Sequence, residues 1–196
     1  MDRHVLEVLA AVALPVMAGC ATARLTVPAV PAAAPAPTVV AAPAEQGGAD
    51  LVVDAWRLGG TTAAHARTRV TDIYRAAARA GTLHRHKRPT RGDAVFFHDT
   101  CDANTDGRFN DPLTLTGVVE RVDADGTVVV ATRIRQGVVR LRMNLEQPHL
   151  RRDPRTHKVL NHYLVGRTGG QPARTTAELW AGFASPPRGP ARLAQR

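Results

Sequence analysis

The chain has 196 residues, a formal net charge of +9 and a pI near 11.0. A domain takes roughly 100 to 200 residues, so the length indicates one domain plus tails and excludes a large multidomain chain. The basic balance favours polyanionic surroundings such as nucleic acid, anionic lipid or an acidic wall polymer, and it does not choose among them.

The first 20 residues predict an export signal. Arg3 lies in a short polar start, an apolar stretch runs over residues 5–16, and Met17-Ala18-Gly19-Cys20 resembles the lipobox of bacterial lipoproteins. We therefore expect residues 1–19 to be a lipoprotein signal peptide and Cys20 to be lipidated, which places the chain in the bacterial cell envelope, facing the periplasm or the cell surface. An ordinary secretory signal with an incidental cysteine is the alternative. Export argues against nucleic acid as the partner.

Residues 20–49 are dominated by Ala, Pro and Val and predict an extended linker. Two helices are expected next, over residues 50–58 and 65–80, and Gly81 ends the second one. Residues 83–91 form a basic loop, interpreted as a solvated loop because it lacks interleaved aromatic residues for base stacking.

A series of strands follows the helices, over residues 94–97, 116–122, 127–134, 138–143 and 159–165, with Asp125-Gly126 as a hairpin turn. The elements predict an α+β domain over residues 50–167, with two helices followed by an antiparallel sheet of about five strands. Residues 168–196 are expected to form a tail with a short helix over 175–183, in which Leu179, Trp180 and Phe183 face inward.

The loop between the first two strands is rich in Asp and Asn. Asp102, Asn104 and Asp106 match the first ligand positions of a calcium loop, Gly107 matches its turn, and Asp111 is a late carboxylate. Leu113 occupies the position where a bidentate Glu would complete the ligand shell. An Asx-rich turn whose side chains bond their own backbone is the preferred interpretation, and calcium is the alternative.

Several segments together carry a family resemblance. They are residues 52–59 (VVDAWRLG), the helix ending in YRAAARAG, Pro89-Thr-Arg-Gly92-Asp93-Ala-Val-Phe-Phe97, the strand Gly117-Val-Val-Glu120 and the run Asp125-Gly126-Thr127-Val128. This order resembles the CHAP and NlpC-type cell-wall peptidases, which are papain-like cysteine hydrolases of peptidoglycan. The resemblance covers about residues 50–165 and implies a papain-like fold.

The family uses a Cys at the N-terminus of the long helix, a His on a facing strand and a polar residue that orients that His. In this sequence those positions correspond to Arg69, Leu115 and about Thr132. Neither a guanidinium nor a leucine side chain can act as nucleophile or base. The resemblance therefore implies a degenerate member.

Two functions from different classes follow. The first is a lipid-anchored envelope protein that binds peptidoglycan or an envelope partner through a non-catalytic domain, with no cofactor. The second is an active peptidoglycan endopeptidase or amidase that works through Cys101, with His98 three residues away, or through an arrangement that the sequence does not reveal. A loop cysteine without a catalytic task is the preferred interpretation of Cys101.

Overall fold

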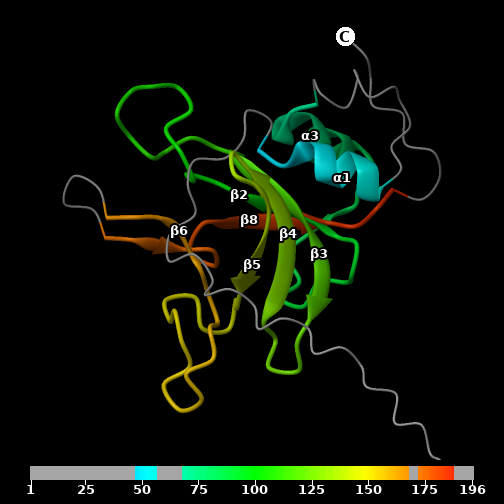
Figure 1. Ribbon diagram of the computed structural model, residues 1–196. Coiled ribbons are helices and arrows are strands. Elements are labelled where there is room, and N and C mark those ends of the chain that lie inside the picture. Colours follow the sequence, from blue (N-terminus) through cyan, green and yellow to red (C-terminus); the bar gives the residue numbers. More distant parts are fainter. Residues whose placement is uncertain (1–46, 57–67, 168–171, 188–196) are drawn as a thin grey trace, which may run out of the picture. The chain divides into compact units, whose positions relative to one another are not determined.

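The computed structural model describes residues 47–56, 68–167 and 172–187 (Figure 1). The predicted signal peptide, the lipidation site at Cys20 and nearly all of the predicted linker lie outside these residues. The described part is an α+β domain with helices α1 (Ala49–Ala55) and α3 (Val70–Arg79). Helix α1 begins at Ala49, one residue before the expected start of the domain at residue 50, and Gly47-Gly48 pack with it against the sheet.

The main sheet has six strands in the order β1-β8-β2-β3-β4-β5, and every neighbouring pair is antiparallel (Figure 1). A second sheet pairs β6 with β7. The strands are β1 (Leu83–His84), β2 (Ala94–Phe97), β3 (Leu115–Val122), β4 (Val128–Ile134), β5 (Gly137–Met143), β6 (Tyr163–Val165), β7 (Arg174–Thr175) and β8 (Trp180–Ala184).

The predicted hairpin between β3 and β4 is confirmed. Gly126 has a φ of 80°, which favours glycine, and its N–H donates to the carbonyl of Asp123 at 2.9 Å. The carboxylate of Asp125 accepts the N–H of Thr127 at 3.0 Å. The turn therefore fixes where β4 begins and sets its register against β3.

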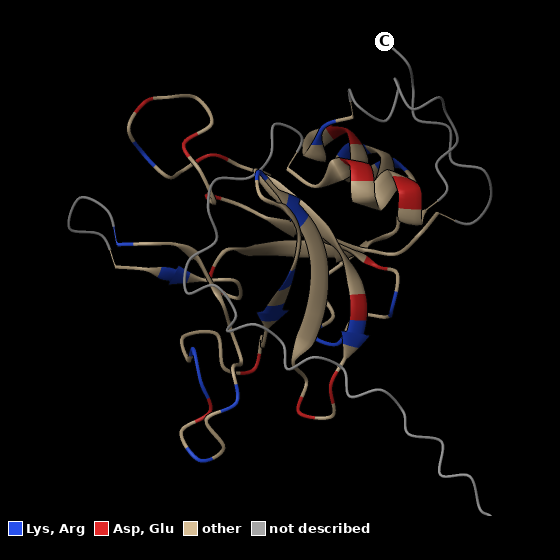
Figure 2. Ribbon diagram, viewed as in Figure 1, with Lys and Arg blue, Asp and Glu red and all other residues tan. Residues whose placement is uncertain are grey.

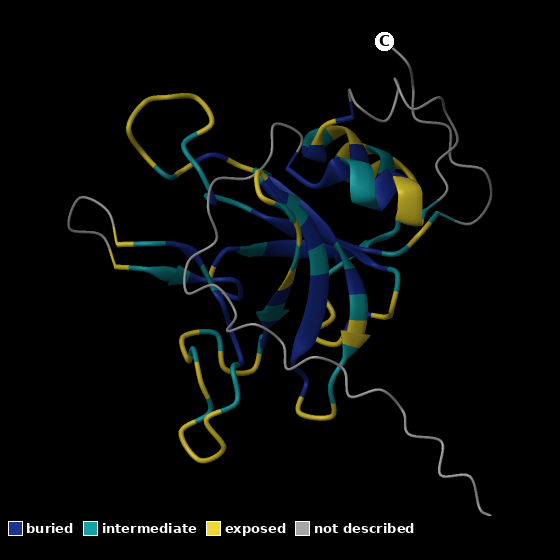
Figure 3. Ribbon diagram, in the orientation of Figure 1, coloured by how far each residue is buried: buried dark blue, intermediate teal, exposed yellow. Residues whose placement is uncertain are grey.

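Apolar side chains lie on both faces of the main sheet. One face packs against the helices, and its core contains Val52, Ile73 and Phe96. The opposite face carries a larger core around Phe97, Leu141 and Phe183. Figure 3 shows buried residues along the central strands and exposed ones in the loops. A sheet that is covered on both faces produces strands with continuous burial rather than alternation, as in β2.

The prediction of a short helix over residues 175–183 is wrong. Only Arg174–Thr175 and Trp180–Ala184 are regular there, and both segments are strands. Strand β8 pairs with β1 on one side and with β2 on the other, so the C-terminal segment is part of the main sheet rather than a tail. The domain therefore extends past residue 167 to at least Ala184.

The predicted strand over residues 159–165 is shorter than expected and lies outside the main sheet. Tyr163–Val165 forms β6, while Val159 makes only an isolated bridge with Arg152. The other four predicted strands correspond to β2, β3, β4 and β5.

Candidate functional site

The region where the N-terminus of α3, the start of β3 and the middle of β4 border Gly47 and Gly48 is here called the α3–β3 corner, and the three positions that the resemblance singles out lie on these elements. Arg69 is the exposed N-cap residue of α3, and its backbone N–H donates to the carboxylate of Asp72 at 3.0 Å. A guanidinium has no acceptor atom, so only the Asp72 half of a reciprocal cap forms. Arg69 therefore places a permanent positive charge at the helix start.

Leu115 and Thr132 lie inside the corner. Leu115 is the first residue of β3 and is 1 % exposed, within the apolar core. Thr132 is fully buried, and its hydroxyl donates to the carbonyl oxygen of Thr116 at 2.6 Å. Because that hydroxyl donates a hydrogen bond to the neighbouring strand β3, Thr132 stabilises the sheet rather than orienting a base.

The backbone of Gly47 and Gly48 fills the space between these elements. A Cβ on Gly47 would lie 2.6 Å from the carbonyl oxygen of Thr114, and one on Gly48 would lie 2.4 Å from the carbonyl oxygen of Thr116 and 2.7 Å from the Thr132 hydroxyl. The carbonyl of Gly47 accepts the N–H of Thr116 at 2.7 Å. The glycine pair is thus packed against the sheet so closely that no side chain fits there.

An ion pair also connects α1 to the sheet. Asp50 pairs with Arg133 of β4, so the first turn of α1 is tied to the strand on which Thr132 lies. The helix was predicted from the sequence, but the packing of the residues before it against β3 and β4 was not. Two consecutive glycines directly before an apolar helix are the signal that could have suggested a close approach.

Cys101 is the free cysteine of the described residues, and its surroundings do not activate it. Burial, followed by the nearby carboxylate of Asp111, raises the pKa of its thiol above the ordinary value. A catalytic cysteine needs the opposite shift, because the thiolate is the nucleophile. The Nδ1 atom of His98 accepts the backbone N–H of Leu113 at 3.0 Å, so this ring stabilises the loop.

The Asp-rich loop bonds its own backbone. The Asp102 carboxylate accepts the N–H groups of Asp106 and Gly107 at 3.1 and 2.8 Å, and the amide oxygen of Asn104 also accepts from Asp106 at 2.9 Å. Buried Asp111 accepts the N–H of Ala103 at 2.8 Å. These are the contacts of an Asx-rich turn. Within residues 47–56, 68–167 and 172–187, no group of three or more His, Cys, Asp or Glu side chains is arranged to hold a metal ion.

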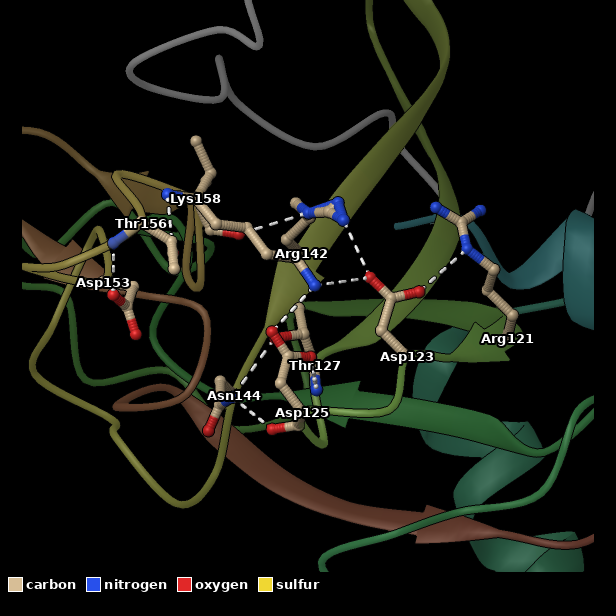
Figure 4. Close-up of polar contacts among 10 residues, drawn as sticks. Arg121, Asp123, Asp125, Thr127, Arg142, Asn144, Asp153, Thr156 and Lys158 are labelled. Carbon is tan, nitrogen blue, oxygen red and sulfur yellow. Dashed lines mark hydrogen bonds and ion pairs between the residues drawn. The ribbon is translucent and has the colours of Figure 1, made fainter.

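A charged network that the sequence did not predict lies at the far end of the β3–β4 hairpin (Figure 4). The carboxylate of Asp123 accepts hydrogen bonds from the guanidinium groups of Arg142 at 2.8 Å and Arg121 at 3.1 Å. The Lys158 ammonium lies between two carboxylates, 2.7 Å from that of Asp125 and 3.0 Å from that of Asp123. Burial opposes ionisation of Asp125, yet hydrogen bonds from Lys158 and Thr127 outweigh it and lower the pKa of this carboxyl to about 2. The network fastens the loop that carries Lys158 to the hairpin.

Two buried asparagines hold the same loop from inside. Asn161 accepts the N–H of Asn144 at 2.8 Å and donates to the carbonyls of Gln147 and Leu150, each at 2.8 Å. Asn144 donates to the hydroxyl of Thr127 at 3.2 Å. Both side chains are almost completely buried, so their amides replace the hydrogen bonds that an irregular segment would otherwise lack.

Comparison with known proteins gave no match to any family model, any curated protein or any solved structure. None of the described helices is both long enough and apolar enough to cross a membrane.

Proposed function

We propose that this chain is a lipid-anchored protein of the bacterial cell envelope whose papain-like domain, of CHAP or NlpC type, binds peptidoglycan or an envelope partner without cleaving it. Export and anchoring rest on the predicted signal that ends at Cys20. The α+β architecture, with an amphipathic helix beside an antiparallel sheet, is compatible with the papain-like assignment.

The observation that carries the non-catalytic part is the closed α3–β3 corner. Arg69, Leu115 and Thr132 supply neither a nucleophile nor a base, and the backbone of Gly47-Gly48 fills the space beside them. Burial and the carboxylate of Asp111 raise the pKa of the Cys101 thiol, which disfavours the nucleophilic thiolate and supports a non-catalytic domain. The α3–β3 corner therefore supplies no nucleophile and no base for a papain-type reaction.

Charge supports binding to a wall polymer. The chain carries 26 Lys and Arg against 17 Asp and Glu, and peptidoglycan stem peptides carry carboxylates. Arg69 adds its charge to the positive end of the α3 dipole, and it is exposed to an approaching anion. Charged residues of both signs line the loops, as Figure 2 shows, so the proposed attraction is local, at exposed positive residues such as Arg69, rather than a uniform field.

The test is a pelleting assay with purified peptidoglycan and a matched pair of variants. Arg69→Glu reverses the charge at the start of α3, and Arg79→Glu makes the same change at its exposed C-terminal end. A glutamate is well tolerated at a helix N-terminus, so lost folding does not explain weaker binding by Arg69→Glu. We expect this variant to pellet several-fold less than Arg79→Glu. Equal pelleting by the two variants would contradict binding at the corner.

A further inference from the structure

Strand β5 ends the main sheet, with β4 on one side and no described strand on the other (Figure 1). Ile134 and Gly137 lie directly opposite each other and flank a two-residue turn. Such a flanking pair exchanges hydrogen bonds, and opposite pairs then alternate between bonded and non-bonded along the hairpin. Val138, Arg140 and Arg142 of β5 therefore direct their backbone N–H and C=O groups away from β4.

Contacts at Arg142 agree with this alternation. Its N–H donates to the Nδ1 atom of His162 at 3.1 Å, and its carbonyl accepts the N–H of His162 at the same distance. At Val138 and Arg140 no described residue bonds the corresponding outward groups. Val138 is 49 % exposed, although it is a large apolar residue, and the Arg140 side chain is 67 % exposed. This part of β5 is an open strand edge, which is a template for pairing with another chain.

The charge of the hairpin limits what can pair there. Residues 128–143 contain four arginines and no acidic residue, and basic residues are visible along β5 in Figure 2. Three of these arginines form ion pairs with carboxylates from other elements. The pairs are Arg133 with Asp50, Arg140 with Glu120, and Arg142 with Asp123. Arg135, at the exposed turn, has no ion-pair partner among the described residues. A second copy of this strand would bring like charges together, whereas an acidic segment would be attracted.

We propose that the outer edge of β5, at Val138 and Arg140, binds an extended acidic peptide segment of a partner protein, which adds a strand to the main sheet. The partner's backbone pairs with the outward N–H and C=O groups of these two residues, and its carboxylates lie near Arg135, whose charge no described acidic residue balances. This edge is separate from the α3–β3 corner, so the proposal does not depend on binding of peptidoglycan.

Amide hydrogen exchange of the full chain in detergent micelles tests the pairing. The probe is a pool of octapeptides with Glu at alternate positions and Val, Thr or Ile between them, and the control pool has Lys in place of Glu. We expect the acidic pool at millimolar concentration to slow exchange of the Val138 and Arg140 amides at least tenfold, and the basic pool to leave it unchanged. Unchanged exchange with the acidic pool, or equal slowing by both pools, would overturn the proposal.

Variants separate the backbone contribution from the charge contribution. Val138→Pro removes the outward N–H at an edge position that tolerates proline, and we expect it to abolish the slowing at Arg140. Arg135→Glu should weaken peptide binding at least fivefold, and it breaks no ion pair to another described residue. Arg155→Glu makes the same charge change on an exposed loop and should bind like the unaltered chain. Equal weakening by Arg135→Glu and Arg155→Glu would show that only total charge matters and would contradict this site.

Discussion

Arg142 and His162 are joined by a reciprocal pair of hydrogen bonds. The N–H of Arg142 donates to Nδ1 of the His162 ring, the N–H of His162 donates to the carbonyl of Arg142, and both distances are 3.1 Å. The ring therefore accepts at Nδ1, and His162 is only 2 % exposed. Protonation of Nδ1 would remove this acceptor, so the connection between β5 and the segment before β6 requires a neutral histidine.

The pH dependence of stability should report this histidine. Burial, followed by the charges of Arg142, Arg151 and Arg152, lowers the pKa of His162 from 6.5 to about 4. The unfolded chain therefore binds the proton more readily than the folded one. The stability contributed by neutral His162 is complete above pH 6.5 and is lost as the pH falls from 6.5 to about 4. The loss amounts to about 3 kcal/mol at 1.36 kcal/mol per pKa unit.

Urea unfolding at a series of pH values between 7 and 4 measures this loss. In the matched variant His162→Asn, the amide oxygen can still accept the N–H of Arg142 but cannot titrate. We expect the free energy of unfolding of this variant to change with pH by about 3 kcal/mol less than that of the unaltered chain over the same interval. The same pH dependence in both proteins would show that other groups cause the loss.

Gly48 should tolerate alanine worse than any glycine without close neighbours. A Cβ there meets the Thr116 carbonyl at 2.4 Å, and the residue has a φ of 81°. Gly81 has a comparable φ of 66° with nothing within 4 Å of its Cβ position. We expect Gly81→Ala to cost about 1 kcal/mol through backbone strain alone. Gly48→Ala should cost about 3 kcal/mol, because overpacking is added to the same strain. Equal thermal shifts in the two variants would mean that Gly48 does not pack against the sheet.

Asn161 should be one of the most sensitive polar positions. Asn161→Ala leaves the N–H of Asn144 and the carbonyls of Gln147 and Leu150 without their partner. A buried group without a partner costs about 1 to 3 kcal/mol. The Asn144 N–H is buried, whereas the two carbonyls are only partly buried and that of Gln147 also accepts the N–H of Leu150 at 3.2 Å, so we expect a loss of about 2 to 3 kcal/mol in chemical unfolding. Asn110 is exposed, so Asn110→Ala should change stability by less than about 0.5 kcal/mol. A loss below about 1 kcal/mol for Asn161→Ala would contradict the buried network.

The Cys101 thiol should react slowly at neutral pH. Alkylation by iodoacetamide, followed from pH 7 to 10 in a chain that also carries Cys20→Ala, gives the midpoint of its ionisation. We expect a midpoint above the ordinary value for a thiol, because burial and the carboxylate of Asp111 disfavour the thiolate. Asp111→Asn should lower the midpoint, whereas Asp106→Asn changes charge in the same loop without that effect. A midpoint below the ordinary value would identify an activated nucleophile.

Local patterns predicted the β2–β5 part of the sheet well. The Asp125-Gly126 turn and the apolar runs around it depend on residues close in sequence, and they place β3 and β4 within one or two residues of their observed bounds. The helix α3 was also predicted from its buried face of Val70, Ile73 and Ala77. In each of these cases the physical cause, a turn conformation or one apolar face, is contained within a short segment.

Strand β8 could not be predicted in this way. Leu179, Trp180 and Phe183 have a spacing that suits the inner face of a helix, and the strand has no alternation because it is buried between β1 and β2. Its conformation depends on partners about 85 to 100 residues away in the sequence. The seating of Gly47-Gly48 and the Arg142–His162 pair are also long-range, so no local pattern carries them.

Incubation of the chain from residue 21 onward with purified peptidoglycan tests the central claim most directly. The supernatant is assayed for released muropeptides and the pellet for bound protein, with Cys101→Ala run in parallel. We expect the protein to pellet because of its positive charge, and we expect no release of muropeptides because the α3–β3 corner supplies no nucleophile. Cys101→Ala should behave identically. Release of muropeptides that Cys101→Ala abolishes would contradict the account and identify a hydrolase with a relocated nucleophile.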